Sequence, residues 1–289
     1  MKRIAILGCE NSHADAFLKF IREREEFADL EVVGVYSEEA DAVARLQERF
    51  AVPALAHYAD AVGQLDGLIV TARHGANHYK YAAPYIESGI PMFIDKPITV
   101  DGEEAISFMQ ALEANGVRVC GGSSLKQDAF VAELREDARA GVDGPTVGGY
   151  VCTPYDRSNP YGNFYFYAQH LVEIVCEIFG RNPLSVTARE NGEQIHVLFH
   201  YEGYDCVGLF ANHRYLYFAA RMAQKKTKSY EIPSTNEWFY RELSEFHALL
   251  QGGEQHVTYS DFIAPVFIMN AIERALQSGK EEPICYPEI

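Results

Sequence analysis

The sequence is poor in positive charge. Its 289 residues include 25 Lys and Arg against 41 Asp and Glu, which gives a formal net charge of −16. A phosphate backbone or an anionic membrane surface requires a basic footprint, so this charge argues against nucleic acid and membranes as partners. A small anionic ligand stays compatible with it, because a local potential can oppose the overall sign.

Long hydrophobic runs and closely paired cysteines are also absent. No apolar run approaches the length of a membrane span, and the stretch Ile4 to Leu7 is too short for a secretory signal. The six cysteines are scattered without a C-x-x-C pair, which is typical of reduced thiols and disfavours a structural zinc site. We therefore expect a cytoplasmic protein without a metal centre.

The first 120 or so residues alternate strand-like and helix-like patterns. Continuous apolar strands separated by amphipathic helices predict a parallel sheet covered on both faces, and ligands of such doubly wound sheets lie beyond the carboxyl ends of the strands. The strands are expected at 3–7, 30–36, 67–71, 91–94 and 117–121, and the helices at 12–27, 38–50, 77–88 and 101–116.

The pattern changes after Lys126. Successive strand-like runs joined by short turns predict a largely antiparallel sheet. The strands are expected at 147–152, 184–190, 194–200, 206–212 and 215–221, and the helices at 128–140, 164–179, 236–250 and 260–278. The fold class is thus an N-terminal α/β domain, residues 1–124, followed by a C-terminal α+β domain, residues 125–289.

The loop after the first strand has little glycine. "ILGCENSHADA" lies where a dinucleotide fold places G-x-G-x-x-G, yet only Gly8 is present, and Glu10 and His13 replace the other two glycines. Gly8 supplies the turn, and Asn11 and Ser12 are competent helix caps. An ordinary strand–turn–helix explains the loop equally well, and a carboxylate at Glu10 would repel a pyrophosphate.

The end of the second strand bears on the choice of cofactor. Ser37 holds the place where an acid usually binds the ribose 2′-hydroxyl, and two acids follow it. Serine does not repel a 2′-phosphate, whereas Glu38 and Glu39 would. NAD and NADP therefore both remain open.

The tripeptide Asp95-Lys96-Pro97 directly follows an apolar strand. At that position the chain should meet a ligand, and a partly buried Lys96 can exchange a proton or stabilise an alkoxide. Asp95 can hold the ammonium group or reach a ribose hydroxyl. Taken alone, the tripeptide is better explained as a strand-end turn with a surface ion pair.

Several segments together carry a family resemblance. "DKP" matches an E-K-P turn, "TARHGANH" echoes T-P-N-x-x-H with two residues inserted, and "GNFYFYAQHLVEIV" is similar to G-G-x-x-x-D-x-x-x-H. With "FYRELSEFHALLQGGE" and "SDFIAPVFIMNAIERALQSGK" near the end, the sequence resembles the Gfo/Idh/MocA family of nicotinamide-dependent oxidoreductases over nearly its whole length.

The resemblance implies a Rossmann-like first domain and hydride transfer between NAD or NADP and a carbinol carbon, often of a sugar or cyclitol. Lys96 matches the family's catalytic lysine, and His170 matches the histidine expected to exchange the hydroxyl proton. A satisfied histidine on an apolar helix is the alternative for His170. The expected cofactor-binding residues are Gly8, Glu10, Asn11, Ser12, Ser37, Thr71, Arg73, His78, Asp95 and Lys96.

Two departures weaken the functional part of the resemblance. The family's acid four residues before the histidine is Phe166 here, and its first motif glycine is Tyr161. Asp156, Glu173 or a substrate group would then support the imidazole, or Lys96 would act alone. The alternative functions are a non-catalytic dinucleotide- or sugar-binding regulator, and a lyase or hydrolase that uses bound NAD transiently.

Aromatic residues gather before His170. Sugar C–H faces stack on aromatic rings, and a guanidinium group binds carboxylates, although these rings would equally serve an interface. The expected substrate-binding residues are Tyr155, Arg157, Tyr165, Tyr167 and Gln169, with Arg214 as a weaker candidate and Lys225, Lys226 and Lys228 as a solvated loop. The alternation in "YLYFAAR" and the family's habit predict a homodimer or homotetramer.

Overall fold

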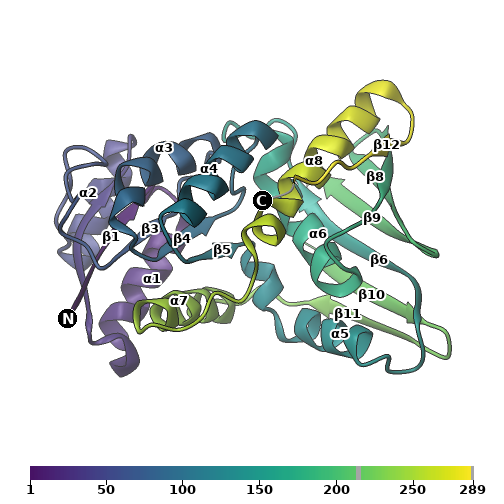
Figure 1. Ribbon diagram of the computed structural model, residues 1–289, viewed down its shortest axis with the longest axis horizontal. Helices are drawn as coiled ribbons and strands as arrows, with labels where there is room; N and C mark the ends of the chain where they lie inside the picture. The colour runs from purple at the N-terminus through teal and green to yellow at the C-terminus, as the bar shows by residue number, and fades with distance from the viewer. Residues whose placement is uncertain (213–215, 288–289) are drawn as a thin grey trace. The chain divides into compact units, whose positions relative to one another are not determined.

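The computed structural model describes residues 1–212 and 216–287 (Figure 1). The chain divides into two compact units. The first joins Met1–Gly122 with Asn236–Tyr259, and the second joins Ser123–Thr235 with Ser260–Glu288. Residues 236–259 therefore return to the first unit, whereas the sequence analysis expected a single boundary at residue 124.

The first unit contains a five-stranded parallel sheet in the order β2-β1-β3-β4-β5. Its strands are β1 (Lys2–Leu7), β2 (Leu30–Tyr36), β3 (Gly67–Val70), β4 (Met92–Asp95) and β5 (Val119–Gly122). Every residue of β3, β4 and β5 is buried, as expected for strands covered on both faces. The order reverses beside β1, so the carboxyl ends of β1 and β3 flank the switch point where such sheets bind ligands.

Helices follow most strands of this unit. They are α1 (Ser12–Glu23), η1 (Glu25–Phe27), α2 (Ala40–Phe50), α3 (Ala76–Ala82), η2 (Ala83–Ser88), α4 (Gly102–Ala114) and α7 (Glu237–Leu250). Two of their boundaries have simple causes. Pro84 at the start of η2 separates the predicted helix 77–88 into α3 and η2, and the Asp101 side chain caps α4 by accepting from the Glu104 N–H at 2.8 Å.

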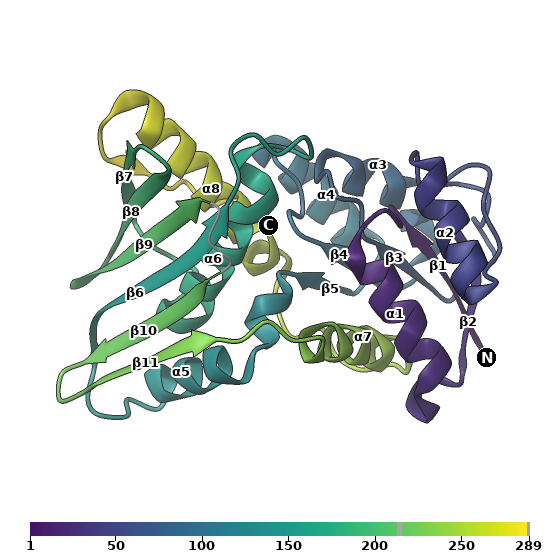
Figure 2. The ribbon, with the colours of Figure 1, turned by 180° about the vertical axis from the view of Figure 1, so that it is seen from behind.

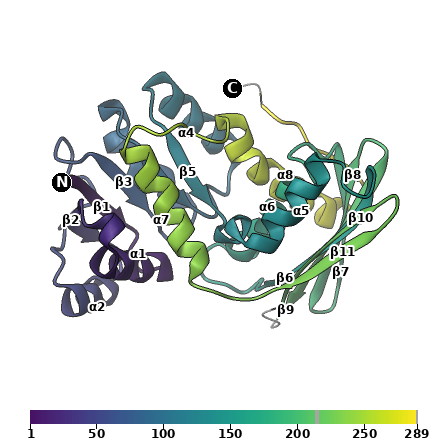
Figure 3. The same ribbon diagram turned by 90° about the horizontal axis from the view of Figure 1, so that it is seen from below.

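Helix α7 belongs to the core of the first unit. Its residues Leu243, Phe246 and Leu249 share one buried cluster with Phe17 of α1 and Phe93 of β4. Helices α1 and α7 are in direct contact and run beside each other in Figure 3. An apolar face of this size stabilises the unit only when it is buried, so the helix that the sequence analysis assigned to the second domain completes the first.

The second unit contains a seven-stranded sheet in the order β11-β10-β6-β9-β8-β7-β12, seen from behind in Figure 2. Its elements are η3 (Ser124–Gln127), α5 (Ala129–Arg139), β6 (Thr146–Tyr155), α6 (Phe164–Phe179), β7 (Ser185–Asn191), β8 (Gln194–Tyr201), β9 (Tyr204–Asn212), β10 (Tyr217–Ala223), β11 (Thr227–Ile232), α8 (Tyr259–Ser278) and β12 (Glu282–Pro283). All pairs are antiparallel except β6 with β9. This confirms the predicted fold class of a doubly wound parallel sheet followed by a largely antiparallel α+β domain.

Helices α5, α6 and α8 lie on one face of this sheet (Figure 3). The cover is close, because a Cβ atom at Gly149 would collide with Phe179 of α6 and one at Gly208 would press on Leu171. Residues that alternate with these point to the other face, where Val207 and Met222 are 36% and 45% exposed. The sheet therefore has one helix-covered face and one face that none of these helices covers.

The predicted solvated loop at Lys225, Lys226 and Lys228 is wrong for its last member. Lys228 lies on β11, and its ammonium group binds Glu133, at 2.8 Å, and Asp137, both on α5. This ion pair holds the edge strand against the helix. Arg214 and Tyr215, which the sequence analysis also considered, lie outside the described residues.

No helix in the described part of the chain combines the length and the apolarity that crossing a membrane requires.

Gly8 closes the turn between β1 and α1. Its φ is +80°, and a Cβ atom there would collide with the backbone of Ala72, which follows β3. The first strand and the chain after the third thus approach each other as closely as glycine permits.

A Gly8→Ala substitution should lower the free energy of unfolding and weaken dinucleotide binding. The left-handed φ alone costs about 1–2 kcal/mol for alanine, and the collision with Ala72 adds to it. Urea denaturation measures the loss. The matched control is Gly63→Ala, since Gly63 has φ +75° but no atom lies within 4 Å of the Cβ that alanine would add there. Equal losses in the two variants would contradict the close-approach argument.

Candidate functional site

The loop between β1 and α1 is organised by its polar side chains. The Asn11 side chain does not cap α1; its amide instead donates to Asp95 Oδ2 at 2.6 Å. The Ser12 hydroxyl, on an exposed residue, donates to Asn11 Oδ1 at 3.2 Å. The first turn of α1 therefore has no side-chain cap from Asn11, which suits a helix N-terminus that receives an anionic group.

The Glu10 carboxylate is held by hydrogen bonds within the first unit. Its carboxylate accepts from the Ser37 hydroxyl at 2.6 Å and from the Arg73 backbone N–H at 2.9 Å. The predicted repulsion of a pyrophosphate is therefore reduced, because two donors already hold the charge. The same bonds link the ends of β1 and β2 to the chain after β3. Thr71 adds a further link, since its hydroxyl donates to the Gly8 carbonyl oxygen at 3.1 Å.

Asp95 is the centre of a buried polar cluster in the first unit. Besides Asn11, its carboxylate has His13 Nδ1 at 3.3 Å and accepts from the Lys96 backbone N–H at 2.7 Å. The other ring nitrogen of His13, Nε2, lies 3.2 Å from Glu242 Oε2 on α7. Glu242 and Asp95 are fully buried and His13 is 3% exposed. A single imidazole thus bridges two carboxylates that come from elements far apart in the sequence.

Burial governs the protonation of this cluster. Burial lowers the pKa of His13, although the Asp95 carboxylate raises it. Burial also raises the pKa of Asp95, although His13 and Lys96 lower it. The His13 ring also packs edge-on against Phe17 and Phe239, with ring centroids 5.8 and 4.6 Å apart. The side chain at the third glycine position of the motif therefore points into the protein core.

Lys96 follows β4 and is 5% exposed. Burial lowers the pKa of its ammonium group, the carboxylates of Asp95 and Glu242 raise it, and Arg73 lowers it again. The net direction is downward, which brings the amine closer to exchanging a proton near neutral pH. The Lys96-Pro97 peptide bond is cis.

His78 is fully buried and contacts the backbone next to the Asp95-Lys96-Pro97 turn. Its Nε2 is 2.8 Å from the Ala72 carbonyl oxygen, and its Nδ1 is 3.3 Å from that of Ile98. Both nitrogens therefore contact backbone just after β3 and just after the cis bond. This corrects the expectation that His78 contacts a cofactor, because a ring held by two carbonyl groups at full burial has no face toward a ligand.

Three observations indicate that the first unit can bind a dinucleotide. The turn at Gly8 has no room for a side chain, the N-terminus of α1 is not capped by Asn11, and the Glu10 charge is already bound by donors. All three lie at the carboxyl edge of the parallel sheet, where ligands of such sheets bind.

His170 lies on α6 in the second unit and is 8% exposed. Its Nδ1 is 2.6 Å from the hydroxyl oxygen of Ser123, the residue between β5 and η3. The acids that the sequence analysis considered are engaged elsewhere. Asp156 accepts from Ser158 at 2.8 Å, and Glu173 accepts from the Gln169 amide at 2.8 Å. The residue that supports the imidazole is thus a serine that the sequence analysis did not consider.

The predicted substrate residues differ in their surroundings. Gln169 is fully buried and bound to Glu173, and the Tyr165 hydroxyl donates to Glu273 at 2.9 Å. Tyr155 is 3% exposed with its ring near Phe210, and Arg157 binds Glu190.

Tyr167 is the member of this set whose ring lies beside His170, at 6.2 Å between centroids. The structure therefore brings the Tyr167 ring beside the imidazole, whereas Gln169 binds Glu173 and Arg157 binds Glu190 of β7.

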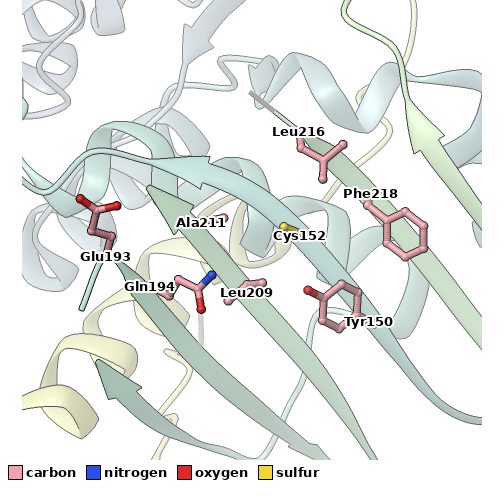
Figure 4. A pocket seen from close by; sticks show the side chains of 8 residues that line it. All are labelled: Tyr150, Cys152, Glu193, Gln194, Leu209, Ala211, Leu216 and Phe218. Atoms are coloured by element: carbon pink, nitrogen blue, oxygen red, sulfur yellow. The ribbon is translucent and has the colours of Figure 1, made fainter. Parts of the chain in front are cut away.

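A shallow hollow lies on the open face of the second sheet (Figure 4). Its apolar lining comes from β6, β9, β10 and the residue before β10, and consists of Tyr150, Cys152, Leu209, Ala211, Leu216 and Phe218. The described residues that line it include no histidine or lysine, so its chemistry suits packing against an apolar surface rather than proton transfer. Within residues 1–212 and 216–287, no group of three or more His, Cys, Asp or Glu side chains is arranged to hold a metal ion.

Comparison with known families assigns the first unit. Residues 2–123 match the family model described as "Oxidoreductase family, NAD-binding Rossmann fold", GFO_IDH_MocA. This segment is similar to the NAD-binding domain of the Gfo/Idh/MocA oxidoreductases. The match confirms the predicted resemblance and the predicted cofactor class. No curated protein matches the sequence.

Solved structures share the fold over the whole chain at low sequence identity. A putative myo-inositol dehydrogenase from Sinorhizobium meliloti has 15% identity and a TM-score of 0.83, covering 99% of this chain and 100% of its own. Scyllo-inositol dehydrogenase from Lactobacillus casei, with bound NAD(H) and scyllo-inositol, has 12% identity and a TM-score of 0.85 over 98% and 99%. An oxidoreductase from Agrobacterium radiobacter in complex with NAD+, L-tartaric acid and magnesium has 12% identity and a TM-score of 0.79 over 98% of both chains.

Two residues of the candidate site were missed from the sequence. Glu242 had a usable signal, because it interrupts the apolar stripe of α7 between Phe239 and Phe246 at helical spacing. Ser123 had none, since a serine after a strand is ordinary turn chemistry. Its role follows only from the contact with His170.

The buried His78 should make stability depend on pH. Burial lowers its pKa from 6.5 to about 4, so the folded protein holds the neutral ring. This contribution is complete above pH 6.5 and is lost as the pH falls toward 4, at a total cost of ~3 kcal/mol. Urea denaturation of wild type and His78→Gln between pH 7 and 5 measures it. The variant should lose less stability on acidification, and parallel curves would refute the assignment.

Proposed function

We propose that the protein is an NAD(P)-dependent dehydrogenase that transfers a hydride between nicotinamide and the carbinol carbon of a sugar, cyclitol or related hydroxy compound. The single observation that carries the proposal is Lys96: a nearly buried amine with a lowered pKa, held next to Asp95 at the carboxyl edge of a dinucleotide-binding sheet. The family match to residues 2–123 supports the cofactor. The substrate class rests on the inositol dehydrogenases among the structures of the same fold.

The proposed cofactor site uses the loop and the strand ends of the first unit. Gly8, Asn11 and Ser12 offer backbone and helix N-terminus to the pyrophosphate, and Ser37 lies at the end of β2 where a ribose binds. Glu10, Thr71 and Arg73 hold these segments together. When bound, the nicotinamide ring of NAD(P) accepts or donates the hydride. The choice between NAD and NADP stays open.

The proposed chemistry divides between two side chains. In the oxidative direction, the carbinol carbon gives up a hydride while its hydroxyl proton passes to the neutral amine of Lys96, leaving a carbonyl group and an ammonium ion. Asp95 and Glu242 favour that ammonium ion as it forms. His170, in the second unit, is the second proposed catalytic residue. Tyr167 and Gln169 are the favoured substrate-binding residues, and Tyr155, Arg157 and Tyr165 stay predictions.

A Lys96→Ala variant tests the proposal. The experiment follows reduced-cofactor absorbance with a panel of inositols, sugars and sugar acids including tartrate, and it measures NADH binding by fluorescence. Loss of the amine should lower kcat by about 10²- to 10⁴-fold, the usual contribution of a general acid–base group, while the Kd for NADH changes only a few-fold. The matched control is Lys19→Ala, an exposed lysine on α1.

The outcomes separate the candidate functions. NADH binding without turnover on any substrate, and indifference to Lys96→Ala, would favour the non-catalytic regulator. That alternative is supported by Phe166, which replaces the acid of the family motif and lies with its ring 4.8 Å from that of Tyr167. Absence of binding to NAD, NADH, NADP and NADPH would contradict both functions.

We further propose that the open face of the second sheet joins copies of the chain in a homodimer or homotetramer. The apolar hollow around Leu209 and Phe218 and the exposed Val207 and Met222 support this. The cytoplasmic location stays a prediction.

A charge on this face should break the assembly. Light scattering coupled to size-exclusion chromatography should give a dimer or tetramer for wild type and a smaller species for Leu209→Arg, because an arginine cannot be buried unpaired in an apolar interface. Val62→Arg, on a 44% exposed residue of the first unit, is the control and should not change the mass. A monomeric wild type, or an unchanged Leu209→Arg, would contradict the proposal.

A further inference from the structure

Ser123 occupies a position in the second unit that links backbone and imidazole. It is fully buried, it directly follows β5, and it caps η3. Its hydroxyl oxygen is 2.6 Å from His170 Nδ1 and accepts from the Leu125 N–H at 3.3 Å. Its own backbone N–H donates to Glu173 Oε1 at 3.4 Å. Hydrogen bonds at both its backbone and its side chain therefore hold the serine next to the histidine.

The direction of the Ser123–His170 hydrogen bond follows from counting donors and acceptors. The hydroxyl has one proton to donate, and its oxygen already accepts from the Leu125 N–H. Among the described residues, the acceptor within reach of that proton is His170 Nδ1. The serine therefore donates and Nδ1 accepts. A neutral imidazole whose Nδ1 accepts carries its proton on Nε2.

The charged groups around this pair are engaged with one another. Glu173, one helical turn from Gln169, accepts from the Gln169 amide, and its Oε2 lies 3.9 Å from both Lys126 Nζ and Arg181 Nη1. Lys126 is also within 5.8 Å of the Phe262 ring centroid. Two cations thus share this carboxylate, and the hydrogen bond that the structure gives to His170 Nδ1 comes from a neutral hydroxyl.

We propose that Ser123 is a positioning residue that fixes the neutral His170 ring with its proton on Nε2. This deepens the proposed function and rests on it in one respect: as a catalytic residue, His170 would then act as a hydrogen-bond donor and not as the group that takes up a proton. A carboxylate at Nδ1 would do the opposite, because it would hold a proton on Nδ1 and leave Nε2 as a base. The serine therefore makes the imidazole a hydrogen-bond donor at Nε2 and not a base.

The direct test is ¹⁵N nuclear magnetic resonance of the histidine rings in the cofactor-free protein at a pH where His170 is neutral. A His170→Gln spectrum assigns the resonances. Wild type should show a protonated Nε2 and an unprotonated Nδ1, and Ser123→Ala should show a mixture of the two tautomers. The conservative Ser123→Thr keeps the hydroxyl and should restore the wild-type pattern, and Ser124→Ala, at the adjacent buried serine, should leave it unchanged.

A protonated Nδ1 in wild type would overturn the proposal, and so would a Ser123→Ala spectrum identical to that of wild type. Because this readout needs neither cofactor nor turnover, it is decided separately from the proposed dehydrogenase activity. Where turnover is found, Ser123→Ala should lower kcat roughly ten- to hundredfold, as loss of an orienting partner does, with the Kd for NADH unchanged. Ser123→Thr should recover most of that loss, and a kcat of Ser123→Ala equal to that of wild type would count against the role.

Discussion

The buried carboxylate of Asp95 is the interaction on which the rest of the first unit depends. It is the meeting point of the loop after β1 through Asn11, of α1 through His13, and of the lysine turn through the Lys96 N–H. His13 extends the contact to Glu242 on α7. Removing a buried charge from such a network leaves its partners unsatisfied, so loop, turn and returning helix are held in one arrangement.

This arrangement explains why a loop with a single glycine can still serve a dinucleotide. The glycine that remains, Gly8, is the one that the backbone requires, because its φ is positive and no side chain fits against Ala72. The replacements at the other two positions are bound inward, Glu10 to Ser37 and Arg73, and His13 to Asp95 and Glu242. Glu10 and His13, which replace glycines of the motif, thus stabilise the conformation of the loop.

The sequence was informative where local chemistry decides the structure. Alternating apolar strands and helices, the glycine turn and the Asp95-Lys96-Pro97 turn were predictable, since each depends on neighbours in the chain. Contacts between residues distant in the sequence were not predictable. The return of α7 to the first unit, the contact of His78 with the Ile98 carbonyl group, and the contact of Ser123 with His170 bring together residues 20 or more positions apart. Asp156, Glu173 or a substrate group was considered as a partner of His170, and a buried serine at a strand end supplies a contact that was not considered.

The central claim is that the carboxyl edge of the parallel sheet binds the dinucleotide and that Asp95 couples this edge to Lys96. Hydrogen–deuterium exchange with and without saturating NADH tests it most directly, because binding slows exchange where it rigidifies backbone. The account predicts joint protection of peptides covering residues 8–14 and 92–98, and no joint protection in Asp95→Asn. Protection that leaves both segments unchanged, or that affects 8–14 alone in wild type, would contradict it.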